Sequence, residues 1–178
     1  GALEVNRVQA PVVIPVPGPI APSSGLTQGN VTTLPGNPTT IAESSVDRIS
    51  GELAELHYDV SGSQAHSRLI VSFDDSETPF VTESSDLSGL GFLVFGVSSA
   101  SVTEVQLEIE DTSGVRTVET LIQVGDQEQF YAINLSNLHS PIDLAHVKAI
   151  RLIVSRGSVT NQVGTVRLRA KGLNTAPP

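Results

Sequence analysis

The stretch that decides the fold reads Glu104-Val105-Gln106-Leu107-Glu108-Ile109-Glu110, followed by Asp111-Thr112-Ser113-Gly114. Apolar residues alternate with polar ones, and this period of two predicts a strand with one buried face. The Asp-Thr-Ser-Gly segment predicts a hairpin turn into a second strand over residues 115–124. The fragment therefore indicates antiparallel β structure.

The same pattern of short strands and turn residues continues on both sides of this hairpin. Further strands are predicted over residues 56–60, 69–73, 90–97, 130–135, 149–154 and 163–170. Residues 90–97 are almost all apolar, as expected for a strand covered on both faces. The single helical candidate, residues 141–147, has a turn or two. About eight strands at this spacing predict an all-β fold, an antiparallel β-sandwich over residues 43–178.

The first residues differ from the rest and predict an extended, proline-rich arm over residues 1–42. The first forty hold seven of the eleven prolines, and no charged side chain lies between Arg7 and Glu43. Alternating prolines remove backbone donors and exclude a helix, so the arm is expected near polyproline II and able to follow a sheet edge. Its central apolar residues are Val12, Val13, Ile14, Val16 and Ile20. They indicate either a sticky linker or an arm that docks on a β surface of its own or a neighbouring molecule.

Composition excludes several classes of function. The chain has no Cys, so disulfides and thiolate nucleophiles are ruled out. Its net charge of −9 argues against binding to nucleic acid. No run of 18 apolar residues predicts a membrane span. No Gly-x-Ser-x-Gly motif occurs and the four histidines fit no triad pattern, so we expect no enzymatic activity.

Charge is distributed unevenly along the chain. Residues 43–143 contain 18 acidic and 3 basic side chains, whereas residues 144–178 contain six basic and no acidic ones. A basic patch is predicted from Arg151, Arg167, Arg169 and Lys171. Either these residues pair with acidic neighbours across strands of one domain, or they meet an acidic patch on the next copy of the chain.

Several stretches resemble a known family in their order and spacing. They are Leu56-His57-Tyr58-Asp59-Val60, Asp86-Leu87-Ser88-Gly89 before Phe92-Leu93-Val94-Phe95, Ile133-Asn134-Leu135-Ser136-Asn137-Leu138, Asp143-Leu144-Ala145-His146-Val147 and Gly164-Thr165-Val166-Arg167-Leu168. Residues 51–173 thus resemble the galactose-binding-like jelly rolls found as carbohydrate-binding modules in secreted bacterial proteins. The resemblance implies a jelly-roll β-sandwich and an extracellular or cell-surface location.

The resemblance also raises the question of ligands. Such modules often hold calcium through an acidic residue in the last strand, but residues 166–171 read Val-Arg-Leu-Arg-Ala-Lys, so calcium is not expected there. Sugar-binding members present exposed aromatic rings. The chain has no Trp, and four of its five Phe fall in strand patterns that predict core. Phe80, in a loop, and Tyr131 are therefore the candidate glycan contacts.

Two groups of residues have side chains of the types that bind metal ions. Asp143, His146 and the nearby His139 have ligand-like spacing, but an Asp that caps a helical turn needs no metal. Asp74, Asp75 and Glu77 offer oxygen ligands for calcium, or form a solvated acidic turn. We expect no cofactor, with calcium as the open alternative.

These features lead to two hypotheses about function. The main one is a non-enzymatic extracellular structural subunit that self-assembles into a filament or surface layer, its arm docking on a neighbouring copy. The alternative is a carbohydrate-binding or adhesion module of a secreted or cell-surface protein, with glycan as its partner.

Overall fold

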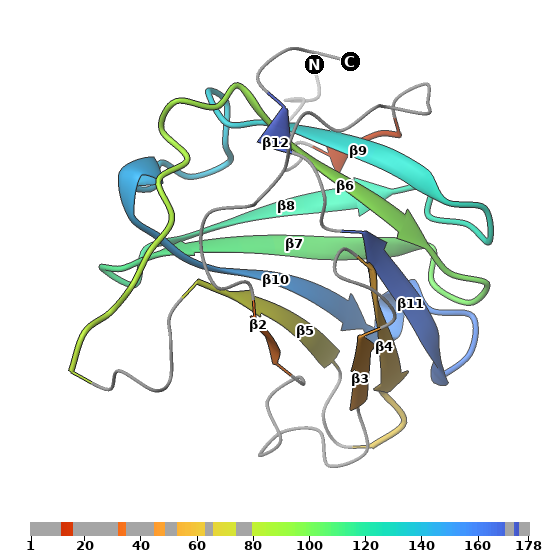
Figure 1. Cartoon of the computed structure of the whole chain (residues 1–178). Coiled ribbons are helices and arrows are strands. Elements are labelled where there is room, and N and C mark those ends of the chain that lie inside the picture. Colours follow the sequence, from red (N-terminus) through yellow and green to blue (C-terminus); the bar gives the residue numbers. More distant parts are fainter. Residues whose placement is uncertain are drawn as a thin grey trace, which may run out of the picture.

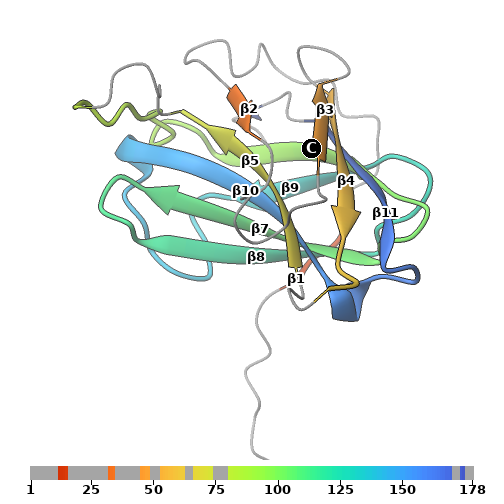
Figure 2. The same cartoon turned by 90° about the horizontal axis from the view of Figure 1, so that it is seen from below.

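Two β-sheets pack face to face in this computed structural model (Figures 1 and 2). The structure describes residues 12–15, 32–34, 45–48, 53–62, 66–73, 80–169 and 173–174. Sheet A has, in spatial order, β1 (Val12–Val13), β8 (Arg116–Ile122), β7 (Glu104–Asp111), β10 (Val147–Ser155), β5 (His66–Ser72) and β2 (Thr32–Leu34). Sheet B has β12 (Leu173–Asn174), β6 (Phe92–Ser98), β11 (Val163–Arg169), β4 (Leu53–Asp59) and β3 (Ser45–Arg48), and β9 (Gln129–Asn134) also pairs with β6.

The predicted antiparallel β-sandwich is confirmed, and its eight expected strands correspond to β4 to β11. The hairpin between β7 and β8 forms where the sequence predicts it. There Gly114 has a φ of +83°, a left-handed conformation that glycine adopts without the strain a side chain causes. The amide of Gly114 donates to the carbonyl of Asp111 and closes the turn.

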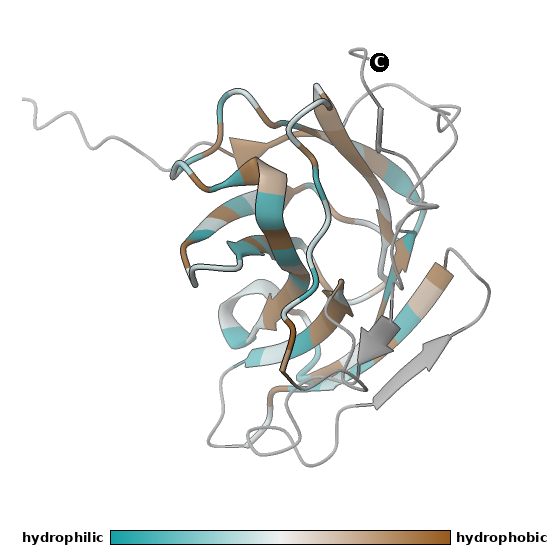
Figure 3. Cartoon of the chain, turned by 60° about the vertical axis from the view of Figure 1, so that its left-hand side comes forward, coloured by the Kyte–Doolittle hydropathy of each residue, from teal (hydrophilic) through white to brown (hydrophobic). Residues whose placement is uncertain are grey.

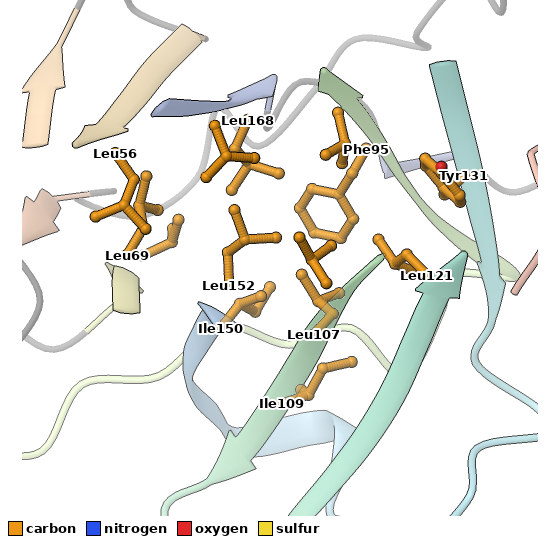
Figure 4. Packing of buried hydrophobic residues seen from close by; sticks show 14 of the residues in the cluster. Leu56, Leu69, Phe95, Leu107, Ile109, Leu121, Tyr131, Ile150, Leu152 and Leu168 are labelled. Atoms are coloured by element: carbon orange, nitrogen blue, oxygen red, sulfur yellow. The ribbon is translucent and has the colours of Figure 1, made fainter. Parts of the chain in front are cut away.

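Apolar side chains from both sheets meet in one core (Figure 4). Leu107 and Leu152 face each other in register on β7 and β10, and both are fully buried. Leu56 and Leu168 approach them from sheet B. Hydrophobic and hydrophilic residues alternate along the strands (Figure 3), so one face of each sheet lines this core.

The described part of the arm lies on its own molecule. β1 runs parallel to β8, with Val12 opposite Thr120 and Val13 opposite Leu121, at the edge of sheet A. The side chain of Val13 packs against the core, whereas Val12 and Ile14 are 51% and 58% exposed. The expectation that the arm can follow a sheet edge agrees with β1, which pairs with β8 of its own chain; docking of the arm on a neighbouring copy stays a prediction. Val16 and Ile20 lie outside the described residues.

The strand β6 confirms the prediction of burial on both faces. Its five central residues are buried: Leu93, Phe95 and Val97 face the core, and on the outer face the side chains of Arg169 and Glu128 lie against Gly96. The short helical prediction is also confirmed, as a 3-10 turn, η1 (Leu144–His146), and a second one, η2 (Arg156–Ser158), follows β10. Among the described residues, no helix has the length and apolar character to cross a membrane.

Candidate functional site

The outer face of sheet A carries an ordered array of polar side chains. Core residues of β7 and β10 point inward, so the residues between them point away from the core. Strand register places the outward residues in three rows across β8, β7, β10 and β5: Thr120–Gln106–Ile153–Arg68, Val118–Glu108–Arg151–Ile70 and Arg116–Glu110–Ala149–Ser72. We call these twelve residues face A.

Ion pairs hold the charged side chains of face A in place. Nη1 of Arg151 donates to Glu108 Oε1 at 2.9 Å and to Glu110 Oε2 at 3.0 Å. Nε of Arg116 lies 2.6 Å from Glu110 Oε2, and Nζ of Lys148 lies 4.0 Å from Glu110 Oε1. Three cations thus share two carboxylates. These contacts restrict the side chains to single arrangements on rigid strands.

The burial of this network departs from the sequence expectation. The alternation in β7 predicts one solvated face, yet the side chains of Glu108 and Glu110 are only 12% and 6% exposed. Each carboxylate lies beneath guanidinium groups from the neighbouring strands, which shields it from water. Strand β7 is therefore covered by the core on one face and, at Glu108 and Glu110, by ion pairs on the other, whereas Gln106 on that outer face is exposed.

The outer face of sheet B, which we call face B, is built differently. Phe92 and Phe130 point outward and are half-buried, contrary to the expectation that four Phe lie in the core. In the row of Phe130 and Gly96, Arg169 Nε donates to Glu128 Oε2 at 3.0 Å, and this pair flanks the bare backbone of Gly96. On the same strand as Arg169, β11, Arg167 Nε donates to Glu55 Oε2 of β4 at 2.7 Å.

The prediction of Tyr131 as a surface ring is wrong. Tyr131 is fully buried, and its hydroxyl donates to the carbonyl of Ile122 at 2.8 Å. Burial raises the pKa of Tyr131 to about 12. Because strand side chains alternate, the ring that β9 presents outward is that of the preceding residue, Phe130. The sequence interpretation assigned these two rings to the wrong faces.

Phe80, the second candidate contact, is accessible. Its ring is 99% exposed in the loop that precedes β6. Farther along this loop, Ser85 pairs with Val147 at the start of β10, next to one end of face A. Its role as a glycan contact stays a prediction.

The basic residues are used within the molecule. Arg151, Arg167 and Arg169 pair with Glu108, Glu55 and Glu128, each from another segment of the same chain. The cross-strand interpretation of the charge pattern is therefore confirmed for Arg151 and Arg167, whereas the partner of Arg169, Glu128, lies in the loop before β9. The three do not form one patch, because Arg151 lies on face A and the others on face B. Lys171 lies outside the described residues.

The first group of candidate metal ligands makes contacts within a single turn. Asp143 caps η1, its Oδ1 accepting from the amide of Ala145 at 3.1 Å, and its Oδ2 lies 2.8 Å from His146 Nδ1. The capping prediction is thus confirmed. In the described part of the chain, no three His, Asp or Glu side chains form a metal-binding group. Asp74, Asp75 and Glu77 fall outside that part.

No protein-family model matches the chain, and no curated protein matches it. Solved structures do. A family 30 carbohydrate-binding module has a TM-score of 0.58 at 14% identity, covering 87% of this chain and 89% of that one. The family 11 carbohydrate-binding module from Clostridium thermocellum, in complex with a β-1,3-1,4-mixed-linked tetrasaccharide, has a TM-score of 0.54 at 16% identity, covering 86% and 97%.

A longer protein also contains this fold. An exo-β-agarase matches with a TM-score of 0.58 at 15% identity over 88% of this chain, but the match spans 25% of the agarase. Identities this low establish the architecture alone. The chain therefore has the β-sandwich fold of carbohydrate-binding modules.

Sequence reasoning missed the network on face A. Its members are far apart in the chain: Arg151 lies 43 residues from Glu108. The available signal was the repeated Glu at every second position of β7 together with outward Arg residues on the flanking strands. Pairing these required the order β8–β7–β10, which the sequence pattern alone does not supply.

Proposed function

We propose that the chain is a non-catalytic carbohydrate-binding module of a secreted or cell-surface protein, and that face A is its glycan-binding surface. The observation that carries this proposal is the pre-arranged network of Arg151, Glu108, Glu110 and Arg116 on the outer face of a sandwich with this fold. Sugar hydroxyls both donate and accept hydrogen bonds. The guanidinium groups of Arg116 and Arg151, held in place by Glu108 and Glu110, provide fixed donors, and the exposed amide of Gln106 provides both a donor and an acceptor.

Energetics support a ligand-binding role for these charges. Desolvated ion pairs contribute little to stability, because the loss of hydration offsets much of the attraction between the charges. Apolar side chains would cover the same strands at least as well. Exposed Gln106 and the aliphatic side chains of Val118, Ile70 and Ile153 complete the surface with polar and apolar contacts.

Self-assembly through the arm has no comparable support. The described strand of the arm, β1, contacts β8 of its own chain, and the similar solved structures described above are carbohydrate-binding modules and a polysaccharide-degrading enzyme. We therefore favour the glycan-binding alternative over the structural subunit.

The test is a binding experiment with matched variants. Isothermal titration with agarose-derived and mixed-linked β-glucan oligosaccharides should show binding, and Glu108→Gln should weaken it about tenfold by removing a charged hydrogen-bond acceptor. Glu55→Gln makes the same change on face B and should leave the dissociation constant unchanged, as should Tyr131→Phe in the core. Absence of binding across a broad glycan panel, or equal losses in Glu108→Gln and Glu55→Gln, contradicts the proposal.

A further inference from the structure

Arg68 on face A has a donor that the protein does not use. Within the described residues, Nε of Arg68 is the one buried side-chain nitrogen or oxygen without a hydrogen-bond partner. A buried donor left unpaired is unfavourable, and native structures seldom contain one without a cause such as a bound ion or ligand. The guanidinium group is only half-buried, so its remaining donors are within reach of solvent.

The described neighbours of Arg68 on face A offer it no carboxylate. Its cross-strand neighbour on β10 is Ile153, and the outward residues on either side of it along β5 are Ile70 and His66. The carboxylates of face A lie on β7, two strands away, because β10 separates β5 from β7. Those carboxylates are already shared by Arg116, Arg151 and Lys148.

The contrast with face B is informative. There, Arg167 and Arg169 each have their own carboxylate, at 2.7 and 3.0 Å. The chain as a whole carries a net charge of −9, so acidic partners are abundant. Arg68 is nevertheless placed beside two isoleucines, and because its Nε is buried, its remaining, accessible donors are the ones that an anion from outside the protein can bind.

We infer that Arg68 binds an anionic substituent of the glycan, so that the module selects an acidic polysaccharide, one that carries carboxylate or sulfate groups. This inference rests on the proposed function and specifies its ligand class. A guanidinium group forms paired hydrogen bonds with either anion. The aliphatic neighbours exclude water and strengthen that contact. Arg151 on β10 and Gln106 on β7 lie one and two strands away on the same side of Arg68, where they can contact the sugar rings that extend across face A.

The experiment compares charged polysaccharides with neutral forms of the same backbone. The probes are polygalacturonate with its methyl ester, and a sulfated galactan with the same galactan after desulfation. We expect at least one charged member to bind about tenfold more tightly than its neutral counterpart, and the pair that shows the difference identifies carboxylate or sulfate. Because Arg68 is partly exposed, the preference should decline as salt is added.

Variants separate a specific contact from general electrostatics. Arg68→Gln should abolish the preference for the charged probe. Arg68→Lys keeps the positive charge but loses the planar pair of N–H donors, so it should retain only part of the preference. Arg167→Gln changes the net charge equally on face B and should retain the full preference. Thermal unfolding provides a second readout: Arg68→Gln should not lower the melting temperature, because the removed donor has no partner to lose.

The outcomes distinguish the two proposals. Equal binding of charged and neutral probes, or an equal effect of Arg68→Gln and Arg167→Gln, overturns the inference and leaves glycan binding by face A intact. A lower melting temperature for Arg68→Gln with an unchanged preference assigns Arg68 a structural role and also overturns it. Failure to bind any probe, charged or neutral, contradicts the proposed function itself.

Discussion

Gly164 shows how closely single residues are fitted in this sandwich. It lies opposite Tyr58 in the pairing of β11 with β4. The hydroxyl of Tyr58 lies 2.6 Å from Ser101 Oγ and donates to the carbonyl of Asn161 at 2.8 Å. A Cβ atom at position 164 would be 2.5 Å from that serine oxygen and 2.7 Å from the tyrosine oxygen. Only glycine leaves room for this buried network.

The first prediction follows from these distances. Gly164→Ala should lower the free energy of unfolding by about 1–3 kcal/mol, because a side chain or the backbone must move to admit the methyl group. Gly157→Ala is the control, since no atom lies within 4 Å of its added carbon, and should change stability by less than about 0.5 kcal/mol. Urea denaturation measures both. Equal effects would show that the network of Tyr58 tolerates the added carbon.

At the same scale, the two rings of β9 show a limit of sequence interpretation. Periodicity predicts that β9 is a strand, and the structure confirms it. Alternation places Tyr131 on the face of Ile133 and Leu135, and Phe130 on the face of Asn134, but ranking the rings by polarity alone reversed this assignment. The partner that satisfies the buried Tyr131 hydroxyl, the carbonyl of Ile122, comes from a strand of the other sheet and is not visible in the local pattern. Residues with distant partners are where sequence reasoning was least informative.

At the scale of elements, Asp111 connects the β7–β8 hairpin to η1. Its Oδ1 accepts from the amides of Ser113 at 2.9 Å and Val115 at 3.1 Å, and its Oδ2 accepts from the amide of Asp143 at 2.9 Å. The amide of Asp143, followed by those of Val115 and Ser113, holds the pKa of Asp111 below its ordinary value. One carboxylate thus fixes a turn and anchors the segment that leads into β10.

The second prediction concerns pH. Because the folded-state pKa of Asp111 is lowered, its contribution to stability is fully present above the unfolded pKa of about 4 and is lost as pH falls through the folded value. Asp111→Asn should therefore destabilise the protein by roughly 1–3 kcal/mol at neutral pH, and the difference should shrink in acid. Urea denaturation across a pH series measures it, and Asp86→Asn, at an exposed turn, should have a smaller effect. A difference that is independent of pH would rule out the charge as its source.

Elements were the level at which the sequence was most informative. Alternation and turn residues identified β4 to β11 because these strands obey a local rule: a residue's neighbours two positions away share its face. The burial of β7 on both faces was missed because it depends on cations from β8 and β10. The short strands β2 and β3 were missed because they form by pairing with β5 and β4 rather than through a pattern of their own.

At the scale of the whole molecule, β1 closes an edge of sheet A. Beyond β7, the strand that pairs with β8 among the described residues is β1, at Thr120 and Leu121. An open strand edge exposes unpaired backbone groups that can bind a second chain. In this arrangement β1 covers the backbone of β8 at Thr120 and Leu121, so we expect β1 to protect this edge against pairing with a second chain.

The third prediction tests this role by sedimentation at two protein concentrations. The full chain should sediment as a monomer, and a chain that begins at residue 16 should associate more as concentration rises, since the edge of β8 is open. Val13→Asp should act like the truncation because Val13 packs against the core, whereas Val12→Asp should not because Val12 is 51% exposed. Polymers of the full chain that disappear on truncation would instead support assembly through the arm.

The opposed rings of Phe130 and Tyr131 have a consequence for how this module diverges. Tyr131 shares its buried face with Ile133 and Leu135, so a slip of β9 by one position would turn all three outward and Asn134 inward. The connection that enters β9 can therefore gain or lose a residue without exchanging the two rings, because the apolar set returns the strand to the same register. Changing the ring that this strand displays requires a substitution at position 130 itself.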